Sequence, residues 1–331
     1  MKITSILWLT QGKETLPSVR FRVIPIAEEL QKYDININVL RYPKTISQRI
    51  SFFAQNLFKT KKYDVCIVQK RILHPAEISA LKIISEKIVF DFDDAIWTDQ
   101  EEAAQPGRGK KWSRFKRMLS HTDLVIAGNS YLAEAAKGVP PVFILPTPLD
   151  TSVYTPGTSD MRTKKFTIGW MGTSSYLAGL SNIAEMLHAV TGDPIQIVSN
   201  MAPTGNFSIH TQFNKWTPEN ELSLLQKFSV GLMPLNDDPY TRGKCGFKLL
   251  QYMSCGVVPI ASSVGFNKDI ISHGVDGFLV TRENQWKEFA STLFNDRNLL
   301  EQMAQKARLK VVSRFDIIQS SKEFLKIIDS I

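Results

Sequence analysis

The chain has few cysteines and lacks any hydrophobic run long enough to span a membrane. Among its 331 residues there are only three cysteines, Cys66, Cys245 and Cys255. This odd number, without the spacing of metal ligands, fits a reducing compartment better than a disulfide framework. No stretch approaches the roughly 18 uninterrupted apolar residues of a membrane-spanning helix. We therefore predict a cytoplasmic protein, and we expect any membrane contact to be peripheral.

The sequence also lacks low-complexity tracts and fixed-period repeats, which argues against a solenoid or a largely disordered chain. At roughly 100 to 200 residues per domain, its length predicts two domains. The formal net charge of +8 favours an anionic partner such as nucleic acid, nucleotide phosphates or an acidic membrane surface. The basic and aromatic residues form no recognisable nucleic-acid-binding motif, so we expect no nucleic acid partner.

Apolar runs alternate with amphipathic runs along the chain, which predicts alternating strands and helices. The amino-terminal apolar run is too short for a signal-peptide core and is predicted to be a buried strand. In the first half, strands are expected at residues 3–9, 35–40, 63–70, 87–93, 123–129 and 142–150, with helices at 20–33, 46–62, 75–87 and 112–122. In the second half, strands are expected at residues 166–172, 194–199, 230–235, 257–263 and 278–280, with helices at 182–190, 218–228, 247–256, 284–294, 299–315 and 317–329.

The strand-like runs do not alternate with polar residues, which is typical of parallel strands covered on both faces. We therefore predict an α/β protein with two doubly wound parallel sheets. A Thr-, Ser- and Pro-rich stretch separates the halves, giving domains at 1–155 and 166–314 with a linker at 156–165. Ligands of such sheets bind at the carboxyl ends of strands, so facing domains would form a central cleft. The alternative is two independent domains that share no site.

A turn of small residues follows the strand that opens the second half. Gly172, Thr173 and Ser174 stand where backbone N–H groups can meet an anion. The competing interpretation is an ordinary strand-to-helix turn with hydroxyl caps.

A cationic loop precedes the helix expected at 247–256. Arg242, Lys244 and Lys248 surround Gly243 and Gly246. Positive charge at a helix N-terminus is unfavourable for the helix dipole, and a bound anion would remove that conflict. The glycines would let the backbone approach such a ligand closely. The alternative is that both lysines point into water.

Three carboxylates, Asp91, Asp93 and Asp94, stand at the end of a predicted strand. One hypothesis is the DxD pattern of haloacid-dehalogenase-like phosphatases, in which the first Asp is the nucleophile and a magnesium ion assists. That motif usually opens its domain, whereas most of an α/β unit precedes it here. A structural role as a cap or ion pair is the second interpretation. The third is an acidic group that faces the cleft and binds hydroxyls.

Two amphipathic basic stretches, at residues 46–62 and 105–121, are candidates for contact with an anionic membrane. The first combines Ile50, Phe53, Leu57 and Phe58 with Lys59, Lys61 and Lys62. In the second, residues 105–121, the basic residues are Arg108, Lys110, Lys111, Arg114, Lys116 and Arg117. The alternative is an ordinary helix docked on its own sheet.

The stretch "FKLLQYMSCGVVPIASSVGFNKDIISHGVDGFLV", residues 247–280, resembles the donor-binding half of family 4 glycosyltransferases. Nearly the whole chain shares the resemblance: "PSVRFRVIPIAEEL" is similar to the family's opening helix, "ILPTPLDTSVYTP" to its interdomain crossing, and "IGWMGTSSY" to the first turn of its second domain. The resemblance implies the GT-B fold, with two Rossmann-like domains facing a cleft. It also implies that residues 315–331 return to the first domain.

The resemblance assigns roles to individual residues. Gln251 stands where the family commonly has a Glu that holds the donor ribose, and Gly243 replaces the family's other Glu, which contacts the sugar. The Arg and Lys that many members place after the first turn of the second domain are also missing. Lys244, Lys248 or Arg242 would supply that charge. The implied donor site comprises Gly172, Thr173, Ser174, Arg242, Cys245, Gly246, Phe247 and Gln251.

The implied activity is transfer, with retention, of a sugar from a nucleotide sugar to a glycan or lipid-linked acceptor in cell-surface polysaccharide or glycolipid synthesis. Lys244 and Lys248 would stabilise the leaving diphosphate, so no metal or other cofactor is expected. Asp93 or Asp94 would orient the acceptor hydroxyl, and Arg20 and Arg22 would bind an anionic acceptor. The non-enzyme alternative is a glycosyltransferase-like binding subunit, because both familiar glutamates are replaced.

Overall fold

The computed structural model describes residues 3–57, 62–99, 102, 105–138, 140–158, 160, 163–181, 183–204 and 210–331. The chain folds into two compact units. Unit 1 comprises Met1–Pro148, Asp238–Cys245 and Asp316–Ile331, and unit 2 comprises Leu149–Asp237 and Gly246–Phe315. The segment Asp238–Cys245, here called the 238–245 segment, therefore belongs to unit 1 although unit 2 supplies the chain on both sides of it.

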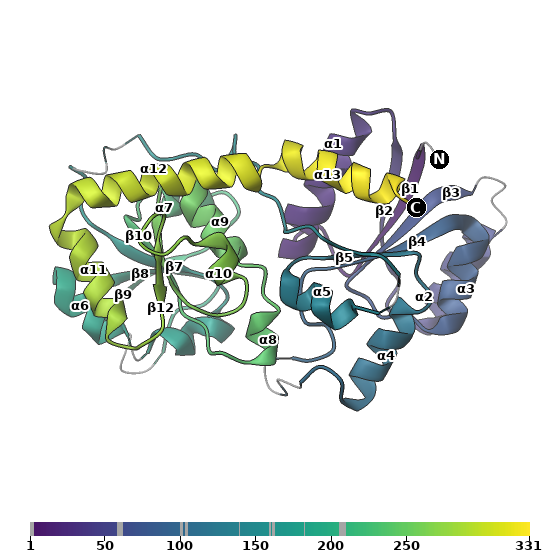
Figure 1. Cartoon of the computed structure of the whole chain (residues 1–331), viewed down its shortest axis with the longest axis horizontal. Helices are drawn as coiled ribbons and strands as arrows, with labels where there is room; N and C mark the ends of the chain where they lie inside the picture. The colour runs from purple at the N-terminus through teal and green to yellow at the C-terminus, as the bar shows by residue number, and fades with distance from the viewer. Residues whose placement is uncertain are drawn as a thin grey trace. The chain divides into compact units, whose positions relative to one another are not determined.

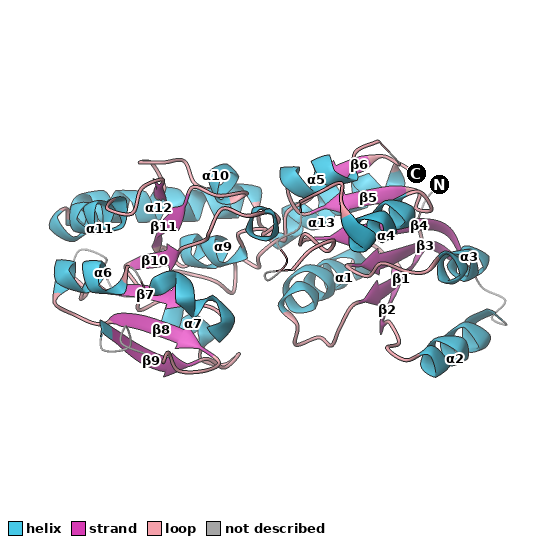
Figure 2. Cartoon of the chain, turned by 90° about the horizontal axis from the view of Figure 1, so that it is seen from below, coloured by secondary structure: helices cyan, strands magenta, loops and turns pink. Residues whose placement is uncertain are grey.

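Unit 1 is built on a parallel sheet whose described strands have the order β2-β1-β3-β4-β5-β6. These strands are β1 (Ser5–Thr10), β2 (Asn36–Arg41), β3 (Tyr63–Gln69), β4 (Ser85–Phe92), β5 (Leu124–Ala127) and β6 (Val142–Ile144). The helices are the π-helical turn η1 (Val19–Val23), α1 (Ile24–Gln31), α2 (Ile46–Leu57), α3 (Pro75–Ile84), α4 (Gly109–Leu119), α5 (Ser130–Ala136), α8 (Pro239–Arg242) and α13 (Ile317–Asp329). Figure 2 shows helices on both faces of this sheet.

Alternate residues of β1 enter different cores. Leu7 and Leu9 belong to a cluster that includes residues of α3, α4 and α5. Ile6 and Trp8 belong to a second cluster, to which α1 and α13 contribute. Trp8 stacks on Phe324 of α13 with 5.1 Å between ring centroids, and Figure 1 shows α13 beside α1. Burial on both faces explains why the strand sequence does not alternate with polar residues.

Unit 2 has a second parallel sheet, with its described strands in the order β12-β11-β10-β7-β8-β9. These strands are β7 (Ile168–Met171), β8 (Ile195–Ser199), β9 (Thr211–Lys215), β10 (Val230–Met233), β11 (Val258–Ser262) and β12 (Phe278–Val280). The helices are the 3-10 helix η2 (Ser174–Leu180), α6 (Ala184–Thr191), α7 (Glu221–Leu225), α9 (Phe247–Ser254), α10 (Asn267–Ile270), α11 (Gln285–Asn295) and α12 (Arg297–Arg314).

Arg308 of α12 ties the start of unit 2 to the end of α9. Its guanidinium donates to the carbonyl oxygens of Thr151 at 2.7 Å and Tyr154 at 2.6 Å. It also donates to the carbonyl oxygen of Ser254 at 3.0 Å. Residues 151–154, which the sequence assigned to the first domain, are therefore fixed within unit 2.

Each sheet reverses its strand order once. In unit 1 the reversal lies at β1, which pairs with both β2 and β3. In unit 2 it lies at β7, which pairs with both β8 and β10. Ligands of open parallel sheets bind beyond the carboxyl ends of strands at such reversals. Residues that follow β7 and β10 are therefore well placed to bind a ligand.

The predicted pair of doubly wound parallel sheets is confirmed. The sequence did not predict β9 or the short helices α5, α8 and α10. Within the described ranges, no helix combines the length and the apolar character needed to cross a membrane.

Candidate active site

The predicted donor site in unit 2 begins where β7 ends. The Gly172 N–H donates to the carbonyl oxygen of Val198 at 3.0 Å. A Cβ atom on Gly172 would collide with Lys248 Nζ and lie 2.7 Å from the Trp170 ring. Glycine is therefore required here by close packing. It brings Lys248 of α9 directly over the carboxyl end of β7.

Lys248 lies in the first turn of α9, between aromatic rings. Its Nζ is 4.5 Å from the ring centroid of Trp170 and 5.5 Å from that of Tyr176. The N-cap of α9 is Gly246, in the left-handed conformation with φ 62°, and glycine has no side chain to cap the helix. The ammonium group and the positive end of the helix dipole are thus close together, an arrangement that favours an anion.

The turn after β7 is held by a residue that the sequence did not single out. The Ser174 N–H donates to Asn200 Oδ1 at 2.9 Å, and the hydroxyls of Thr173 and Ser175 are 3.2 Å apart. Asn200 follows β8 directly. Parallel strands end at the same edge of a sheet. From this rule, Asn200 could have been predicted to lie at this turn.

Gln251 belongs to a buried polar cluster in unit 2. Its Nε2 donates to Glu221 Oε1 at 3.2 Å. Trp216 Nε1 donates to Glu221 Oε2 at 2.6 Å, and the Tyr154 hydroxyl donates to Glu221 as well. Glu221 is only 4% exposed. The carboxylate of this cluster therefore comes from α7, and Gln251 reaches it with its amide. The predicted contact of Gln251 with a ribose stays a prediction.

Asp91 of β4 forms a buried ion pair with Arg22 of η1. Both side chains are 0% exposed, and the Arg22 guanidinium donates to both Asp91 oxygens, at 2.6 to 3.0 Å. Arg22 Nη1 also donates to the Leu145 carbonyl oxygen at 2.8 Å. Burial raises the pKa of Asp91, and the Arg22 charge opposes that rise. Asp91 is thus unable to reach a phosphoryl group as a nucleophile, which argues against the phosphatase hypothesis. Arg22 is held inside unit 1 by these contacts, and its predicted contact with an acceptor stays a prediction.

Asp93 and Asp94 share Lys70, which follows β3. Lys70 Nζ is 3.1 Å from Asp93 Oδ1 and also pairs with Asp94. Lys70 adopts a left-handed backbone conformation with φ 53°, a strain that is common at functional sites. The Nζ of Lys244 lies 3.2 Å from Asp94 Oδ1 and 2.9 Å from the Tyr240 hydroxyl. The predicted catalytic residues Asp93, Asp94 and Lys244 are therefore brought together in unit 1.

The charges of this cluster fix the ionisation of Asp94. Burial acts to raise the pKa of Asp94, but the ammonium groups of Lys70 and Lys244 outweigh it and hold the pKa below its usual value. For Lys70 itself, burial acts to lower the pKa, and the two aspartates more than compensate. Asp94 is therefore a carboxylate at neutral pH, able to accept hydrogen bonds but a weak base.

The 238–245 segment packs against two loops of unit 1. Asn129 Nδ2 donates to the carbonyl oxygens of Gly243 at 3.2 Å and Lys244 at 3.1 Å. The Cys245 thiol donates to the Asp93 carbonyl oxygen at 3.1 Å, and burial raises its pKa well above the usual value. A Cβ atom on Gly243 would lie 2.6 Å from the Cβ of Ala95. No side chain fits at the position of the family's sugar-binding Glu unless Ala95 moves.

The other predicted residues are dispersed. Arg242 ends α8, Phe247 begins α9, and the Arg20 guanidinium lies 4.5 Å from the centroid of the Phe21 ring. The predicted site is thus divided between the units. Arg242, Lys244 and Cys245 belong to unit 1, and Gly172, Thr173, Ser174, Gly246, Phe247, Lys248 and Gln251 belong to unit 2.

The basic stretch at 105–121 contains a helix that docks on its own sheet. Phe115, Met118 and Leu119 of α4 are buried. Lys111, at the exposed side, pairs with Asp99 at 2.7 Å and with Glu102 at 2.6 Å. In the other basic stretch, Phe58, Lys59 and Lys61 lie outside the described residues. The predicted membrane contact of either stretch stays a prediction.

Among the described residues, no group of three or more His, Cys, Asp or Glu side chains could hold a metal ion.

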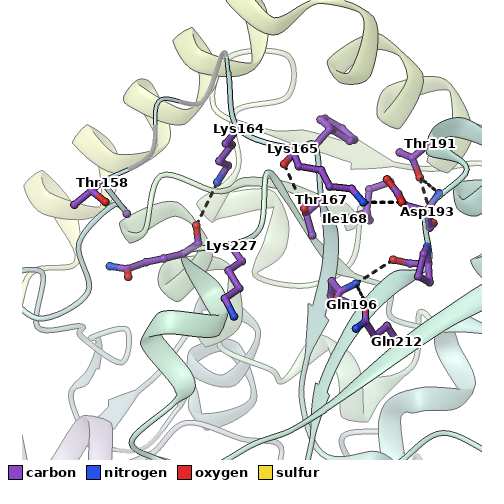
Figure 3. Close-up of a pocket in the computed structure, with 14 residues that line it drawn as sticks. Thr158, Lys164, Lys165, Thr167, Ile168, Thr191, Asp193, Gln196, Gln212 and Lys227 are labelled. Carbon is purple, nitrogen blue, oxygen red and sulfur yellow. Dashed lines mark hydrogen bonds and ion pairs between the residues drawn. The ribbon is translucent and has the colours of Figure 1, made fainter.

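A pocket of about 510 Å³ lies in unit 2, before β7, β8 and β10 begin (Figure 3). There Lys164 Nζ donates to the carbonyl oxygen of Phe228 at 2.7 Å. Burial and the nearby Arg297 lower the pKa of Lys164 to about 8. This pocket is at the amino ends of the strands, opposite the edge that carries Gly172 and Lys248.

Comparison with known proteins gives both sequence and structural matches. A family model described as "Glycosyl transferases group 1" matches residues 187–295. A Dictyostelium discoideum protein, GDP-Man:Man(3)GlcNAc(2)-PP-Dol alpha-1,2-mannosyltransferase, is 28% identical over 138 residues, which are 41% of this chain and 26% of that protein. The match thus spans about a quarter of the length of this curated relative.

Two solved structures resemble nearly the whole chain. The Anabaena protein HepE in complex with UDP and glucose has a TM-score of 0.74 at 16% identity, covering 99% of this chain and 100% of that chain. Sucrose-phosphate synthase from Thermosynechococcus elongatus has a TM-score of 0.78 at 12% identity, covering 99% of this chain and 98% of that chain. At such identities the likeness establishes the fold, which is GT-B.

Proposed function

We propose that this protein is a sugar transferase, because residues 187–295 match the family model of group 1 glycosyl transferases and the chain has the GT-B fold. It moves a sugar from a nucleotide sugar to a glycan or lipid-linked acceptor, in the synthesis of a cell-surface polysaccharide or glycolipid. It works in the cytoplasm, at the inner face of a membrane. One observation carries the proposal: Lys248 lies over Gly172 at the strand-order reversal of unit 2, in the first turn of α9.

The donor diphosphate binds at this point of unit 2. Its negative charge grows as the bond to the sugar breaks, and the Lys248 ammonium with the N-terminus of α9 stabilises that charge. These groups can act without a metal ion. The names of the similar proteins support a nucleoside diphosphate donor, because HepE was solved with UDP-glucose and the mannosyltransferase is named for GDP-Man. Transfer proceeds with retention, as the family resemblance implies.

The acceptor hydroxyl is oriented by the acid cluster of unit 1. Asp94 stays ionised beside Lys70 and Lys244, so it accepts a hydrogen bond from the hydroxyl rather than removing its proton. The departing donor phosphate takes that proton. Lys244 pairs with Asp94 and holds this carboxylate in place, so the orientation of the acceptor depends on it.

The test is sugar transfer by the wild type and by Lys244→Ala. A panel of UDP-, GDP-, TDP- and CMP-sugars is first screened for an increase in melting temperature, since a ligand of the folded state stabilises it. The sugar nucleotides that bind are then assayed for transfer to membrane-extracted acceptors. Lys244→Ala is expected to abolish transfer while the fold persists. Full activity in this variant would refute its assigned role, and no binding to any nucleotide would refute the donor site.

A catalytically inactive binding subunit is the second candidate. It is favoured by Gly243, where Ala95 leaves no room for the family's acid, and by Gln251, whose amide is bonded to Glu221. Such a protein would bind a nucleotide sugar in the melting-temperature screen but would turn over none of them.

A further inference from the structure

A second pocket, of about 240 Å³, lies on unit 1 between α4 and the start of α3. Arginines dominate its lining: Arg49 from α2, and Arg114 and Arg117 from α4. His74 and Glu77 of the first turn of α3 complete the polar lining. The pocket is too small for an oligosaccharide, but it suits a compact charged group.

The pocket carries more positive charge than its own carboxylate can neutralise. Glu77, its only acid among the described residues, pairs with Arg49 at 3.1 Å. Arg114 and Arg117 form no ion pair within the described part of the chain. Burial, and then repulsion from Arg49, lower the pKa of Arg71, which lies next to this lining. A bound anion would relieve this repulsion.

The chemistry of the lining suits a phosphoryl group. Guanidinium groups bind phosphate oxygens through pairs of parallel hydrogen bonds, which a single ammonium is unable to make. The N-terminus of α3 is capped from within, because His74 Nδ1 accepts from the Ala76 N–H at 3.3 Å and Glu77 Oε2 accepts from the His74 N–H at 2.8 Å; the arginines therefore carry the positive charge of the pocket. Arginines from two different helices thus converge on one pocket.

The pocket lies close to the acids that would orient an acceptor. Lys70, which holds Asp93 and Asp94, is four residues before His74. Four residues span at most about 14 Å even when fully extended. The pocket and the acid cluster are therefore neighbours within unit 1.

We propose that this pocket binds the phosphate or diphosphate group of the acceptor. That the ligand is an acceptor rests on the proposed transferase function. The binding of a phosphoryl group does not depend on that function, and it can be measured without any turnover.

The experiment compares two double variants of α4 with the wild-type chain. Arg114→Gln/Arg117→Gln removes two charges from the pocket. Arg108→Gln/Lys110→Gln removes the same charge near the start of α4 but outside the pocket lining. The probes are inorganic pyrophosphate, measured by titration calorimetry, and vesicles of phosphatidylcholine with or without phosphatidic acid, measured by co-sedimentation. All substituted side chains are exposed, so folding should be unaffected.

We expect Arg114→Gln/Arg117→Gln to weaken pyrophosphate binding about tenfold or more, since it removes charge-assisted hydrogen bonds. The control should remain near the wild type. If vesicle binding through phosphatidic acid falls in parallel, the phosphoryl group can belong to a lipid. If only pyrophosphate binding falls, the ligand is a soluble phosphorylated molecule. Equal effects of both double variants, or a loss of vesicle binding alone, would overturn the proposal because either result indicates a general surface charge.

Pyrophosphate can also occupy the proposed donor site, so Lys248→Ala is titrated in parallel. This variant should lose nucleotide binding and keep the component of pyrophosphate binding that depends on Arg114 and Arg117. If Lys248→Ala keeps nucleotide binding, the proposed donor site is refuted. If it loses the component that depends on Arg114 and Arg117, the pocket proposal is refuted. A chain that binds no nucleotide but retains the arginine-dependent component refutes the transferase function alone.

Discussion

Replacement of Asp91 by asparagine tests the buried ion pair of unit 1. Asparagine keeps the shape of the side chain but removes its charge, so the Arg22 guanidinium would stay buried without a counter-charge. Both side chains are 0% exposed and the shortest contact is 2.6 Å. Removal of one partner from such a pair costs about 3–5 kcal/mol of folding free energy. At about 2–4 °C per kcal/mol for a unit of this size, the melting temperature of unit 1 should fall by about 6–20 °C.

A matched control in the same unit separates burial from charge. Asp99→Asn removes the same charge from the pair of Asp99 with Lys111, whose side chains are 54% and 48% exposed. Exposed pairs contribute about 0–1 kcal/mol, so this variant should melt close to the wild type. Differential scanning calorimetry of the three proteins measures both effects. A shift for Asp91→Asn no larger than that for Asp99→Asn would refute the structural role assigned to the pair.

Two further predictions concern packing and pH. Gly243→Ala places a Cβ atom 2.6 Å from the Cβ of Ala95 and 2.8 Å from its backbone nitrogen. It should therefore destabilise unit 1 by about 1–3 kcal/mol in thermal unfolding. The control Gly179→Ala, whose Cβ would meet nothing closer than 3.6 Å, should leave the stability unchanged. Lys164 has its pKa lowered from 10.5 to about 8 in the folded chain, so the unfolded chain binds more protons between these values. The stability of unit 2 should therefore rise from about pH 8 towards pH 10.5. A pH series of melting temperatures in which Lys164→Met shows the same rise would disprove this assignment.

The sequence revealed the fold because its strands are apolar on both faces. The run that forms β1 is buried throughout, and that pattern is visible without any knowledge of neighbours. The strand β9 was missed for the opposite reason, since none of its residues is fully buried and its sequence, TQFNK, has little strand character. Short helices such as α5, with seven residues, present too few turns for a periodicity to be recognised.

The candidate site was only partly predictable. The glycine turn at Gly172 and the cation Lys248 were visible as local patterns, and the structure places them together. The contacts of Gln251 and of the 238–245 segment were not visible in the sequence. Glu221 is 30 residues from Gln251, and Asn129 is 114 residues from Gly243. The contact of Arg22 with Asp91 was also not predicted, because it spans 69 residues and leaves no local signal. At Gly243 the sequence shows only a missing acid, whereas the structure shows that Ala95 requires a glycine.

The central claim is that unit 2 holds a nucleoside diphosphate at Lys248. Titration calorimetry with UDP and with GDP measures this directly for the wild type, Lys248→Ala and Lys287→Ala, a control that changes an exposed lysine of α11 in the same unit. We expect at least one nucleotide to bind the wild type and Lys287→Ala equally, and to bind Lys248→Ala about tenfold or more weakly. Equal affinity in all three proteins, or no binding to the wild type, would contradict it.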